Sequence, residues 1–389
     1  MSDFLPYGRQ SISAEDVAAV TSALNDPLIT QGPRVEAFEQ AFARATGARH
    51  AVAFSSGTAG LHGAAAAAGL GPGDDVLTTP LSFVSSSNCA VFVGAKPRFS
   101  DVDSASANLD TAAAVSSGAA AGAKACVVVS LAGLPADLDP LQALRADGLV
   151  VIEDGCHALG AKRAGAPLGD GSAADMTVFS MHPVKAITTG EGGVVTTDSD
   201  EYAERLSQFR THGIRRGGDE SDPLKGPWHY DVATLGFNYR ITDFQCALGE
   251  TQLSRLPEFI EQRNRVADAY RSALTGIDGI SLPATPRDGD THAYHLFVIR
   301  LDEGAARRRQ VYEFLLEQGI GTQLHYIPIY RHSLYQGMGY TDAEAACPNA
   351  ERYYEQALSL PMFPAMTEAD VERVAVALRA ALAVDIPNP

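Results

Sequence analysis

The spacing of hydrophobic residues along the chain changes repeatedly between helical and strand-like periods. Apolar positions three and four residues apart predict helices over 14–26 and 35–47, and Gly47 is placed to end the second helix. Short apolar runs predict strands instead, because a strand buried on both faces shows no polar side. Such runs lie at 50–54, 124–133 and 148–155, and further strands are predicted at 74–80, 96–102, 175–181 and 192–198. Between them, helical segments are predicted at 83–94, at 138–148 and after a tight turn near residue 56.

Buried strands that alternate with helices are typical of parallel βαβ units, so this region predicts an open, doubly wound, mostly parallel sheet. A long helical pattern over 238–274 ends the region. A strand at 292–301 and helices at 307–319 and 368–383 then predict a smaller α+β domain. We therefore expect an α/β fold with an N-terminal arm and large domain over 1–250 and a small C-terminal domain over 251–389.

Composition and charge exclude several classes of protein. Hydrophobic residues make up 46% and charged residues 20% of the 389 residues, as in ordinary globular proteins. The net charge of −17 argues against nucleic acid as a partner, because binding its phosphates requires excess Lys and Arg. No run reaches the roughly 18 apolar residues of a membrane span, and the N-terminus lacks a signal-peptide pattern. The five cysteines include no CxxC pair, so we expect reduced thiols, a cytoplasmic protein and no metal site.

Ligands of doubly wound sheets bind beyond the carboxyl ends of the strands, so polar residues there are the first candidates for chemistry. Ser56, Gly57 and Thr58 follow the strand predicted at 50–54 and open a helix. Backbone N–H groups at such a helix N-terminus suit a phosphate. The alternative, which is more common on spacing alone, is that Ser56 or Thr58 only caps the helix.

Asp154 follows a run of apolar residues at the end of the strand predicted at 148–155. A carboxylate in such a place is costly to bury without a partner, and a protonated ring nitrogen is one such partner. A helix cap or a loop carboxylate explains the position equally well. His157 lies three residues further on, and its simpler interpretation is a core or capping histidine.

Lys185 lies in the stretch "FSMHPVKAITTGEGG" (179–193), five residues after Ser180. A single lysine in a loop is usually a solvated cation. The order of the candidate residues favours a second hypothesis, because a phosphate-type turn, a strand-end Asp, a strand-end Ser and a Lys together suit pyridoxal phosphate. The aldehyde of that cofactor requires a Lys, its ring nitrogen a carboxylate and its phosphate a helix N-terminus.

The stretches "FSMHPVKAITTGEGG", "EDGCHALGA" and "GFNYRITDFQCALGETQL" resemble the DegT-type nucleotide-sugar aminotransferases. The resemblance runs from residue 6 to residue 364 and implies an aspartate-aminotransferase-like fold, which is fold type I of pyridoxal phosphate enzymes. Within the family, "PYGRQSI", "LITQGP" and "LHYIPIYRHSLY" are most similar to the pseudaminic acid pathway transaminases, which make UDP-4-amino-4,6-dideoxy-N-acetyl-β-L-altrosamine. The resemblance implies pyridoxal phosphate with a pyridoxamine intermediate form, L-glutamate as donor, a UDP-linked 4-keto sugar as acceptor, and a homodimer.

The same resemblance implies roles for individual residues. Lys185 would bind the aldehyde carbon of the cofactor and move a proton as general base and acid, and Asp154 would pair with the ring nitrogen. Phe83 would stack on the ring with His157 close by, and Asn238 would reach the phosphate in the neighbouring subunit. The other phosphate contacts would come from Gly57, Thr58 and Ser180. The sugar-nucleotide side would be lined by Tyr7, Leu28, Ile29, Thr30, Gln31, Ser56, His325, Tyr326, Ile327 and Pro328, with Ser180 and Asn238.

Two alternatives remain open. The same fold could aminate another nucleotide 4-keto sugar, such as GDP-4-keto-6-deoxymannose, a UDP-4-keto-pentose or a dTDP-linked antibiotic sugar. A non-catalytic regulator on this scaffold is expected to lack Lys185 or to carry a DNA-binding module, and the sequence shows neither feature. The sugar 3-dehydratase branch of the family carries His at the position of Lys185, so the lysine favours transamination.

The chain departs from the usual family pattern at Gly60, Met181 and Gly190, where Ala, an aromatic residue and Ala are common. None of these changes removes a catalytic group, but Met181 alters the packing expected beneath Lys185. The segment 215–231 is rich in Gly, Pro and charge, and is predicted to be a loop.

Overall fold

The computed structural model describes residues 4–216 and 224–384. Seven strands of this part of the chain form one sheet, in the order β1-β9-β8-β5-β4-β2-β3. They are β1 (His50–Phe54), β2 (Asp75–Thr78), β3 (Lys96–Phe99), β4 (Ala125–Val129), β5 (Val150–Asp154), β8 (Met176–Ser180) and β9 (Gly193–Thr197). Only β9 runs antiparallel to its two neighbours, β1 and β8. The predicted α/β fold with a mostly parallel sheet is therefore confirmed.

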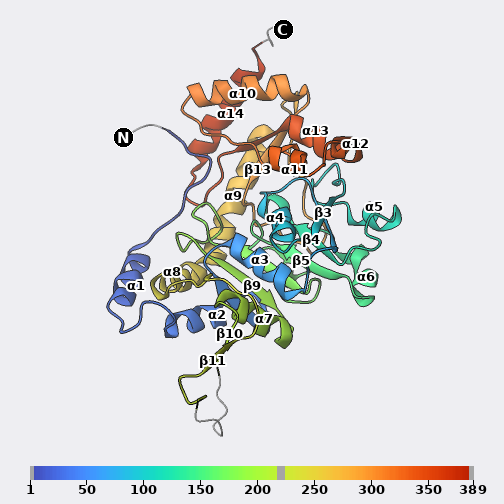
Figure 1. The fold of residues 1–389 in the computed structure, drawn as a ribbon. Helices are drawn as coiled ribbons and strands as arrows, with labels where there is room; N and C mark the ends of the chain where they lie inside the picture. The colour runs from blue at the N-terminus through green and yellow to red at the C-terminus, as the bar shows by residue number, and fades with distance from the viewer. Residues whose placement is uncertain (1–3, 217–223, 385–389) are drawn as a thin grey trace.

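Helices cover both faces of this sheet (Figure 1). Successive residues of a strand point to opposite sides, so each strand contributes side chains to both layers. Val52 and Phe54 pack on one face against α3 (Gly57–Ala67), α4 (Ser85–Phe92) and α7 (Asp200–Arg210). Ala51 and Ala53 pack on the other face against α2 (Pro33–Thr46), α8 (Asp243–Ser254) and α9 (Leu256–Leu274). Near β4 and β5 this second face is covered by α5 (Thr111–Ser116), η2 (Asp139–Leu141) and α6 (Gln142–Ala146). The short helix η1 (Leu131–Gly133) belongs to a separate cluster with Val129 at the end of β4. The sheet is thus wound on both sides.

The first two helices begin and end within two residues of the predicted bounds. Helix α1 (Ala14–Leu24) starts with a capping box, in which the Ser13 hydroxyl accepts from the N–H of Asp16 and the Asp16 carboxylate accepts from the N–H of Ser13. Helix α2 ends at Gly47, whose φ of 79° is the left-handed conformation that glycine adopts without a steric penalty.

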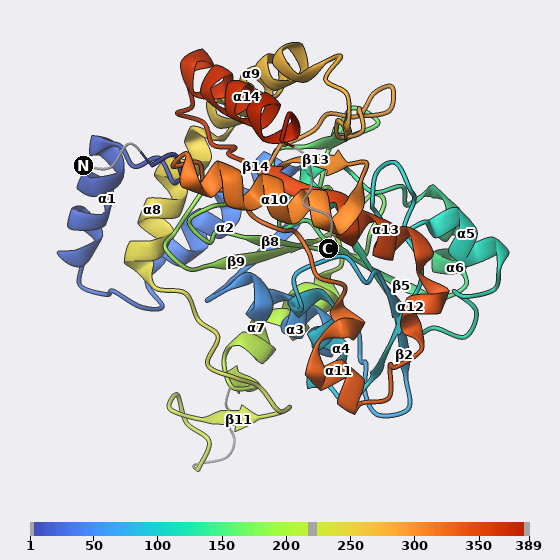
Figure 2. The same ribbon diagram turned by 90° about the horizontal axis from the view of Figure 1, so that it is seen from above.

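Two predicted segments differ from the structure. The helical pattern over 238–274 forms two helices, α8 and α9, which meet at Arg255 because Pro257 in the first turn of α9 starts a new helix. The predicted loop over 215–231 includes strand residues, since β10 (Ile214–Arg216) pairs antiparallel with β11 (Tyr230–Val232). The middle of that loop, 217–223, lies outside the described residues. The paired strands project from the body of the molecule in both views (Figures 1 and 2).

A second, antiparallel sheet lies at the opposite end of the molecule (Figure 1). It consists of β12 (Ile280–Ser281), β13 (Phe297–Leu301) and β14 (Ala357–Leu360), and it packs against α10 (Gly304–Glu317) and α14 (Glu368–Leu382). The remaining elements are β6 (Lys162–Arg163), β7 (Ala166–Pro167), η3 (Ile329–Arg331), α11 (Ser333–Gly337), α12 (Ala343–Ala346) and α13 (Pro348–Gln356). Helix α9 packs against the large sheet through Phe259 and against the second sheet through Tyr270. The domain division near residue 250 stays a prediction.

The N-terminal segment runs back across this second region. The N–H of Leu5 donates to the carbonyl of Gly319 at 2.8 Å, and the carbonyl of Leu5 accepts from Gly321 at 2.8 Å. The carbonyl of Tyr7 accepts from the N–H of Met362 at 2.9 Å. Over the described ranges, none of the helices has both the length and the apolar character needed to cross a bilayer.

Candidate active site

A cavity of about 820 Å³ opens beyond the carboxyl ends of β1, β5 and β8, where ligands of such sheets bind. Its wall includes the Ser56–Thr58 turn after β1, Asp154 at the end of β5 and Ser180 at the end of β8. Lys185, in the loop that follows β8, lines the same cavity. Residues that are up to about 130 positions apart in the sequence therefore meet at one crevice.

The N-terminus of α3 forms one wall of the cavity. The Ser56 hydroxyl accepts from the N–H of Ala59 at 3.1 Å, so Ser56 does cap the helix. Gly57 and Thr58 occupy the first helical positions, where backbone N–H groups have no acceptor within the helix. A Cβ atom on Gly57 would come within 3.0 Å of the Cβ of Ser180, so glycine lets these two elements approach closely. These N–H groups and the hydroxyls of Thr58 and Ser180 form a donor set that suits a phosphate.

Asp154 is only 5% exposed and is held by two donors. Its Oδ2 atom accepts from the Ser86 hydroxyl at 2.5 Å, and its Oδ1 atom accepts from the N–H of Cys156 at 3.1 Å. A carboxylate can accept about four hydrogen bonds, so these two leave capacity for a cationic partner in the cavity that Asp154 lines.

Lys185 is half-buried in a turn in which its N–H donates to the carbonyl of His182 at 2.9 Å. Burial lowers the pKa of its amine; Cys156 and Asp154 oppose this effect, and the Arg263 guanidinium adds a smaller contribution in the direction of burial. A lysine whose charged form is disfavoured has a nucleophilic amine, as a covalent bond to an aldehyde requires. The structure therefore argues against a solvated surface cation.

Neutral histidines form the back of the cavity. The rings of His157 and His295 are 4.4 Å apart, and both residues are buried. The Nδ1 atom of His157 accepts from the N–H of Ala132 at 3.2 Å, so its Nε2 atom carries the proton and donates to the Tyr326 hydroxyl at 3.1 Å. Burial lowers the pKa of His157 and His295 well below the usual range and that of His325 to about 3. The three rings are therefore uncharged near neutral pH.

The residues predicted to contact the sugar nucleotide fall into two groups. The first group, which lines the cavity, is Tyr7, Ser56, His325, Tyr326 and Ile327. Phe83, which is predicted to stack on the cofactor ring instead, also lines the cavity and is 58% exposed. Six other predicted residues do not line the cavity of their own chain: Leu28, Ile29, Thr30, Gln31, Asn238 and Pro328. Leu28 and Ile29 are exposed, Thr30 pairs with Thr242, and Asn238 pairs with Thr211.

Sequence reasoning missed several residues of the site. Ser86 donates to Asp154, and the run Ser85–Ser87, which follows Phe83 and Val84, was a usable signal because it opens a helix after a predicted strand. His295 also lines the cavity, but its sequence neighbours predict only a buried strand. The described side chains contain no group of three or more His, Cys, Asp or Glu that could hold a metal ion.

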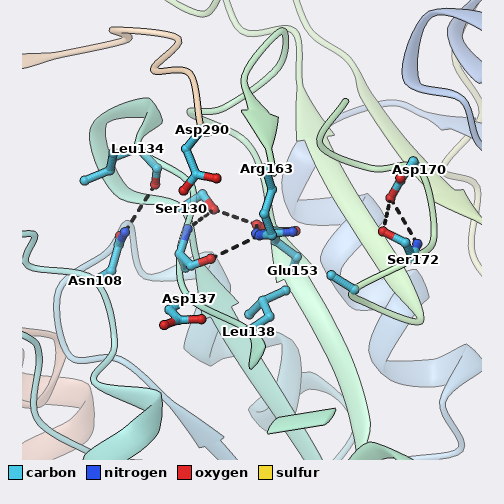
Figure 3. A network of polar contacts seen from close by, with 12 residues as sticks. Asn108, Ser130, Leu134, Asp137, Leu138, Glu153, Arg163, Asp170, Ser172 and Asp290 are labelled. Atoms are coloured by element: carbon cyan, nitrogen blue, oxygen red, sulfur yellow. Dashed lines mark hydrogen bonds and ion pairs between the residues drawn. The ribbon is translucent and has the colours of Figure 1, made fainter. Parts of the chain in front are cut away.

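A buried ion pair anchors the end of β5 (Figure 3). Glu153 is fully buried, and its carboxylate accepts two hydrogen bonds from the guanidinium of Arg163 and one from the Ser130 hydroxyl at 2.6 Å. Adjacent residues of a strand point to opposite faces, so this pair lies behind the sheet position that presents Asp154 to the cavity. It holds the strand end without contacting a ligand there.

Replacement of Glu153 by Ala is expected to lower the free energy of unfolding by about 3–5 kcal/mol, because Arg163 would remain buried without its counter-charge. Urea unfolding followed by circular dichroism measures the change. The matched control is Glu313→Ala, which removes an exposed pair with Arg309 and is expected to leave the unfolding midpoint unchanged. Equal midpoints for Glu153→Ala and the wild type would show that the pair does not stabilise the fold.

Three comparisons with known proteins agree with this geometry. The model of the DegT/DnrJ/EryC1/StrS aminotransferase family matches residues 10–379. The chain is 38% identical over 381 residues to the spore coat polysaccharide biosynthesis protein SpsC of Bacillus subtilis (strain 168), with 97% of this chain and 96% of that protein covered. PseC of Helicobacter pylori, an aminotransferase involved in the biosynthesis of pseudoaminic acid, is 29% identical with a TM-score of 0.88, covering 97% and 99% of the two chains.

A further solved structure bears on the cofactor. The putative sugar aminotransferase Spr1654 of Streptococcus pneumoniae has been solved in a PLP form and a PMP form. Each form is 25% identical to this chain with a TM-score of 0.89, and 97% of this chain and 98% of that chain are covered.

Proposed function

The chain belongs to the DegT/DnrJ/EryC1/StrS aminotransferase family and is a pyridoxal phosphate-dependent sugar aminotransferase, and we propose that it aminates C4 of a UDP-linked 4-keto-6-deoxy-N-acetylhexosamine with L-glutamate as donor. This is the reaction type of the pseudaminic acid pathway. The observation that carries the proposal is the Lys185 amine with its lowered pKa, in one cavity with Asp154 and the N-terminus of α3. The choice of sugar is supported by the "PYGRQSI" and "LHYIPIY" stretches and by the likeness to PseC.

The residues of the cavity fit pyridoxal phosphate. Lys185 would hold its aldehyde carbon, Asp154 its ring nitrogen, and the donor set of Gly57, Thr58 and Ser180 its phosphate. When bound, the cofactor supplies a carbonyl that takes up the amino group and a ring that accepts the electrons released at the donor α-carbon. Phe83, at the exposed side of the cavity, would cover one face of that ring.

The protein side of the mechanism follows from two groups. The Lys185 amine, once released, would take a proton from the α-carbon of the amino donor and deliver it to the carbon that the cofactor aldehyde contributes, and its lowered pKa favours this role. Asp154, held in place by Ser86 and Cys156, would keep a proton on the ring nitrogen. The uncharged His157, with its Nε2 proton directed to Tyr326, adds polar contacts without placing a second cation beside Lys185.

We propose that two chains share each active site. Leu28–Gln31 and Asn238 lie away from their own cavity, and the β10–β11 hairpin nearby presents exposed apolar side chains, including Tyr230 and Val232. A second copy of the chain would cover these groups and bring Leu28–Gln31 and Asn238 to the neighbouring cavity. The DegT-type resemblance of "GFNYR" supports the role of Asn238.

A second candidate keeps the reaction and changes the sugar. SpsC, with 38% identity, is by its name a protein of spore coat polysaccharide biosynthesis, so another nucleotide 4-keto sugar is the competing acceptor.

A panel of nucleotide 4-keto sugars distinguishes these candidates. The purified enzyme is incubated with glutamate and UDP-, GDP- or dTDP-linked 4-keto sugars, and products are identified by mass spectrometry. We expect amination of the UDP-linked 4-keto-6-deoxy-N-acetylhexosamine with a kcat/KM at least about tenfold above the others, since a contact matched to one substrate contributes about 1–3 kcal/mol. A higher kcat/KM with a GDP- or dTDP-linked sugar would reject the proposed acceptor but leave the aminotransferase assignment intact.

A further inference from the structure

Arg263, on α9, is buried in an unusual way. The side chain is 1% exposed, and its recorded acceptors are all backbone carbonyls. Its Nε atom has no hydrogen-bond partner among the described residues. Burial lowers its pKa to about 10, so the guanidinium stays charged at neutral pH. By contrast, Arg307, which is also buried, pairs with the carboxylate of Glu303 at 2.8 Å.

A buried charge without a counter-charge is costly, because carbonyl dipoles replace only part of the lost hydration. An apolar residue of similar volume at this position of α9 would avoid that cost. Local features that oppose stability in this way are found mostly at functional sites. The position of the acceptors then indicates which function Arg263 serves.

The acceptors belong to three segments that meet behind the cavity. One guanidinium nitrogen donates to the carbonyls of Tyr294 (3.1 Å), His295 (3.4 Å) and Met362 (3.2 Å). The other donates to the carbonyls of Val184 (3.5 Å) and Lys185 itself (3.4 Å). Arg263 therefore ties the turn that carries the lysine to the approach to β13 and to the residues after β14. These long, shared bonds form a fork that only a planar guanidinium can supply.

We propose that Arg263 is a positioning residue for Lys185: its guanidinium fixes the backbone of the Lys185 turn through the carbonyls of Val184 and Lys185, and places a positive charge beside that turn. The inference rests on the proposed function of Lys185 as the group that binds the cofactor. Beyond that function, we infer that the buried guanidinium of Arg263 sets the position of Lys185 and the charge around it.

The other titratable groups around Lys185 do not disfavour the charged form of its amine. Asp154 and Cys156 favour the charged amine, which is the opposite effect. The buried histidines His157, His295 and His325 are neutral, and burial keeps Tyr326 protonated. His182 and Glu191 also line the cavity. Burial is the largest cause of the lowered pKa of the Lys185 amine, and Arg263 is the one charged neighbour that acts in the same direction.

The test measures the pKa of Lys185 in the cofactor-free protein. The rate at which an amine-reactive acyl reagent modifies Lys185 is followed against pH by mass spectrometry of the peptide. We expect Arg263→Met to shift the pKa of Lys185 upward and Arg263→Lys, which keeps the charge, to leave it near the wild-type value. The matched control is Arg271→Met, since Arg271 lies on the same helix and donates to the carbonyls of Pro283 and Ala284, away from the lysine. A folded Arg263→Met protein with the wild-type pKa at Lys185 would overturn the charge role.

The Arg263→Lys variant, loaded with cofactor, tests whether Arg263 fixes the backbone of the Lys185 turn. This variant also tests the proposal if Arg263→Met fails to fold. An ammonium group cannot reproduce the five-carbonyl fork, so the rate of the half-reaction with glutamate is expected to fall about tenfold to a hundredfold while the pKa of Lys185 is retained. A wild-type rate would contradict the positioning role. The pKa of Lys185 is measured without cofactor or sugar, so that measurement does not depend on which sugar is the acceptor. A wild-type enzyme that does not react with glutamate would count against the proposed function alone.

Discussion

Lys185→Ala is expected to reduce amino transfer by at least about ten-thousandfold. General acid–base catalysis alone contributes about 10²–10⁴-fold, and this variant also loses the covalent attachment that positions the cofactor. Product formation from glutamate and the preferred 4-keto sugar, quantified by mass spectrometry, measures the loss. The visible absorbance of the lysine-bound cofactor is expected to disappear as well. Turnover near the wild-type rate would remove the basis of the proposed mechanism.

The stability of this variant separates a catalytic defect from a folding defect. Lys185 has a lower pKa in the folded than in the unfolded chain, so its charged form opposes folding at pH values below its folded-state pKa. That penalty fades as the pH rises through the folded-state pKa toward the ordinary value of 10.5. Lys185→Ala removes the penalty, so we expect an unfolding midpoint in urea at pH 7 no lower than that of the wild type. A large drop would mean that the lysine also has a structural role.

Asp154→Asn is expected to lower kcat by roughly a hundredfold to a few thousandfold. Loss of one member of a buried charge pair costs about 3–5 kcal/mol, and each 1.36 kcal/mol corresponds to a factor of about ten in rate. The amide keeps the size of the side chain but no longer holds a proton on the ring nitrogen. The half-reaction with glutamate, followed by stopped-flow absorbance, measures the effect on this step directly.

Two further variants show whether the Asp154 effect is specific. Ser86→Ala removes the 2.5 Å hydrogen bond to Asp154 and is expected to slow the same step about tenfold or more, since hydrogen bonds to charged groups contribute about 1.5–3 kcal/mol. Glu153→Gln alters the adjacent carboxylate on the other face of β5 and is expected to affect stability rather than this rate. If Glu153→Gln slowed the step as much as Asp154→Asn, the loss would reflect distortion of the strand.

Most of the large sheet could be predicted because strands such as β4 (ACVVV) and β5 (VVIED) contain consecutive apolar residues. The antiparallel direction of β9 could not be, since a strand buried on both faces has the same pattern in either direction. The break between α8 and α9 was visible in Pro257 but was obscured by helical spacing on both sides of it. The predicted loop at 215–231 was misread because β10 and β11 are short, charged and exposed.

The candidate site was predictable where chemistry coincides with a strand end, as at Asp154 and Ser180. It was not predictable where a residue acts through its neighbours. Arg263 belongs to the charged-looking stretch "EQRNR", and only the three-dimensional structure shows that its guanidinium turns inward to the carbonyl of Lys185. Asn238 and Leu28–Gln31 were found through a family resemblance, and their own chain does not bring them to the cavity.

The path of the N-terminal segment has a consequence for how the protein is made. Tyr7 lines the cavity, yet its carbonyl is held by Met362, and Leu5 is held by Gly319 and Gly321. During synthesis the residues around Tyr7 leave the ribosome before their partners, which emerge more than 300 residues later. The strands of the large sheet can pair well before that point, because domains fold as they emerge. The cavity is therefore completed only after the strands of the large sheet have paired, by a segment that was translated before them.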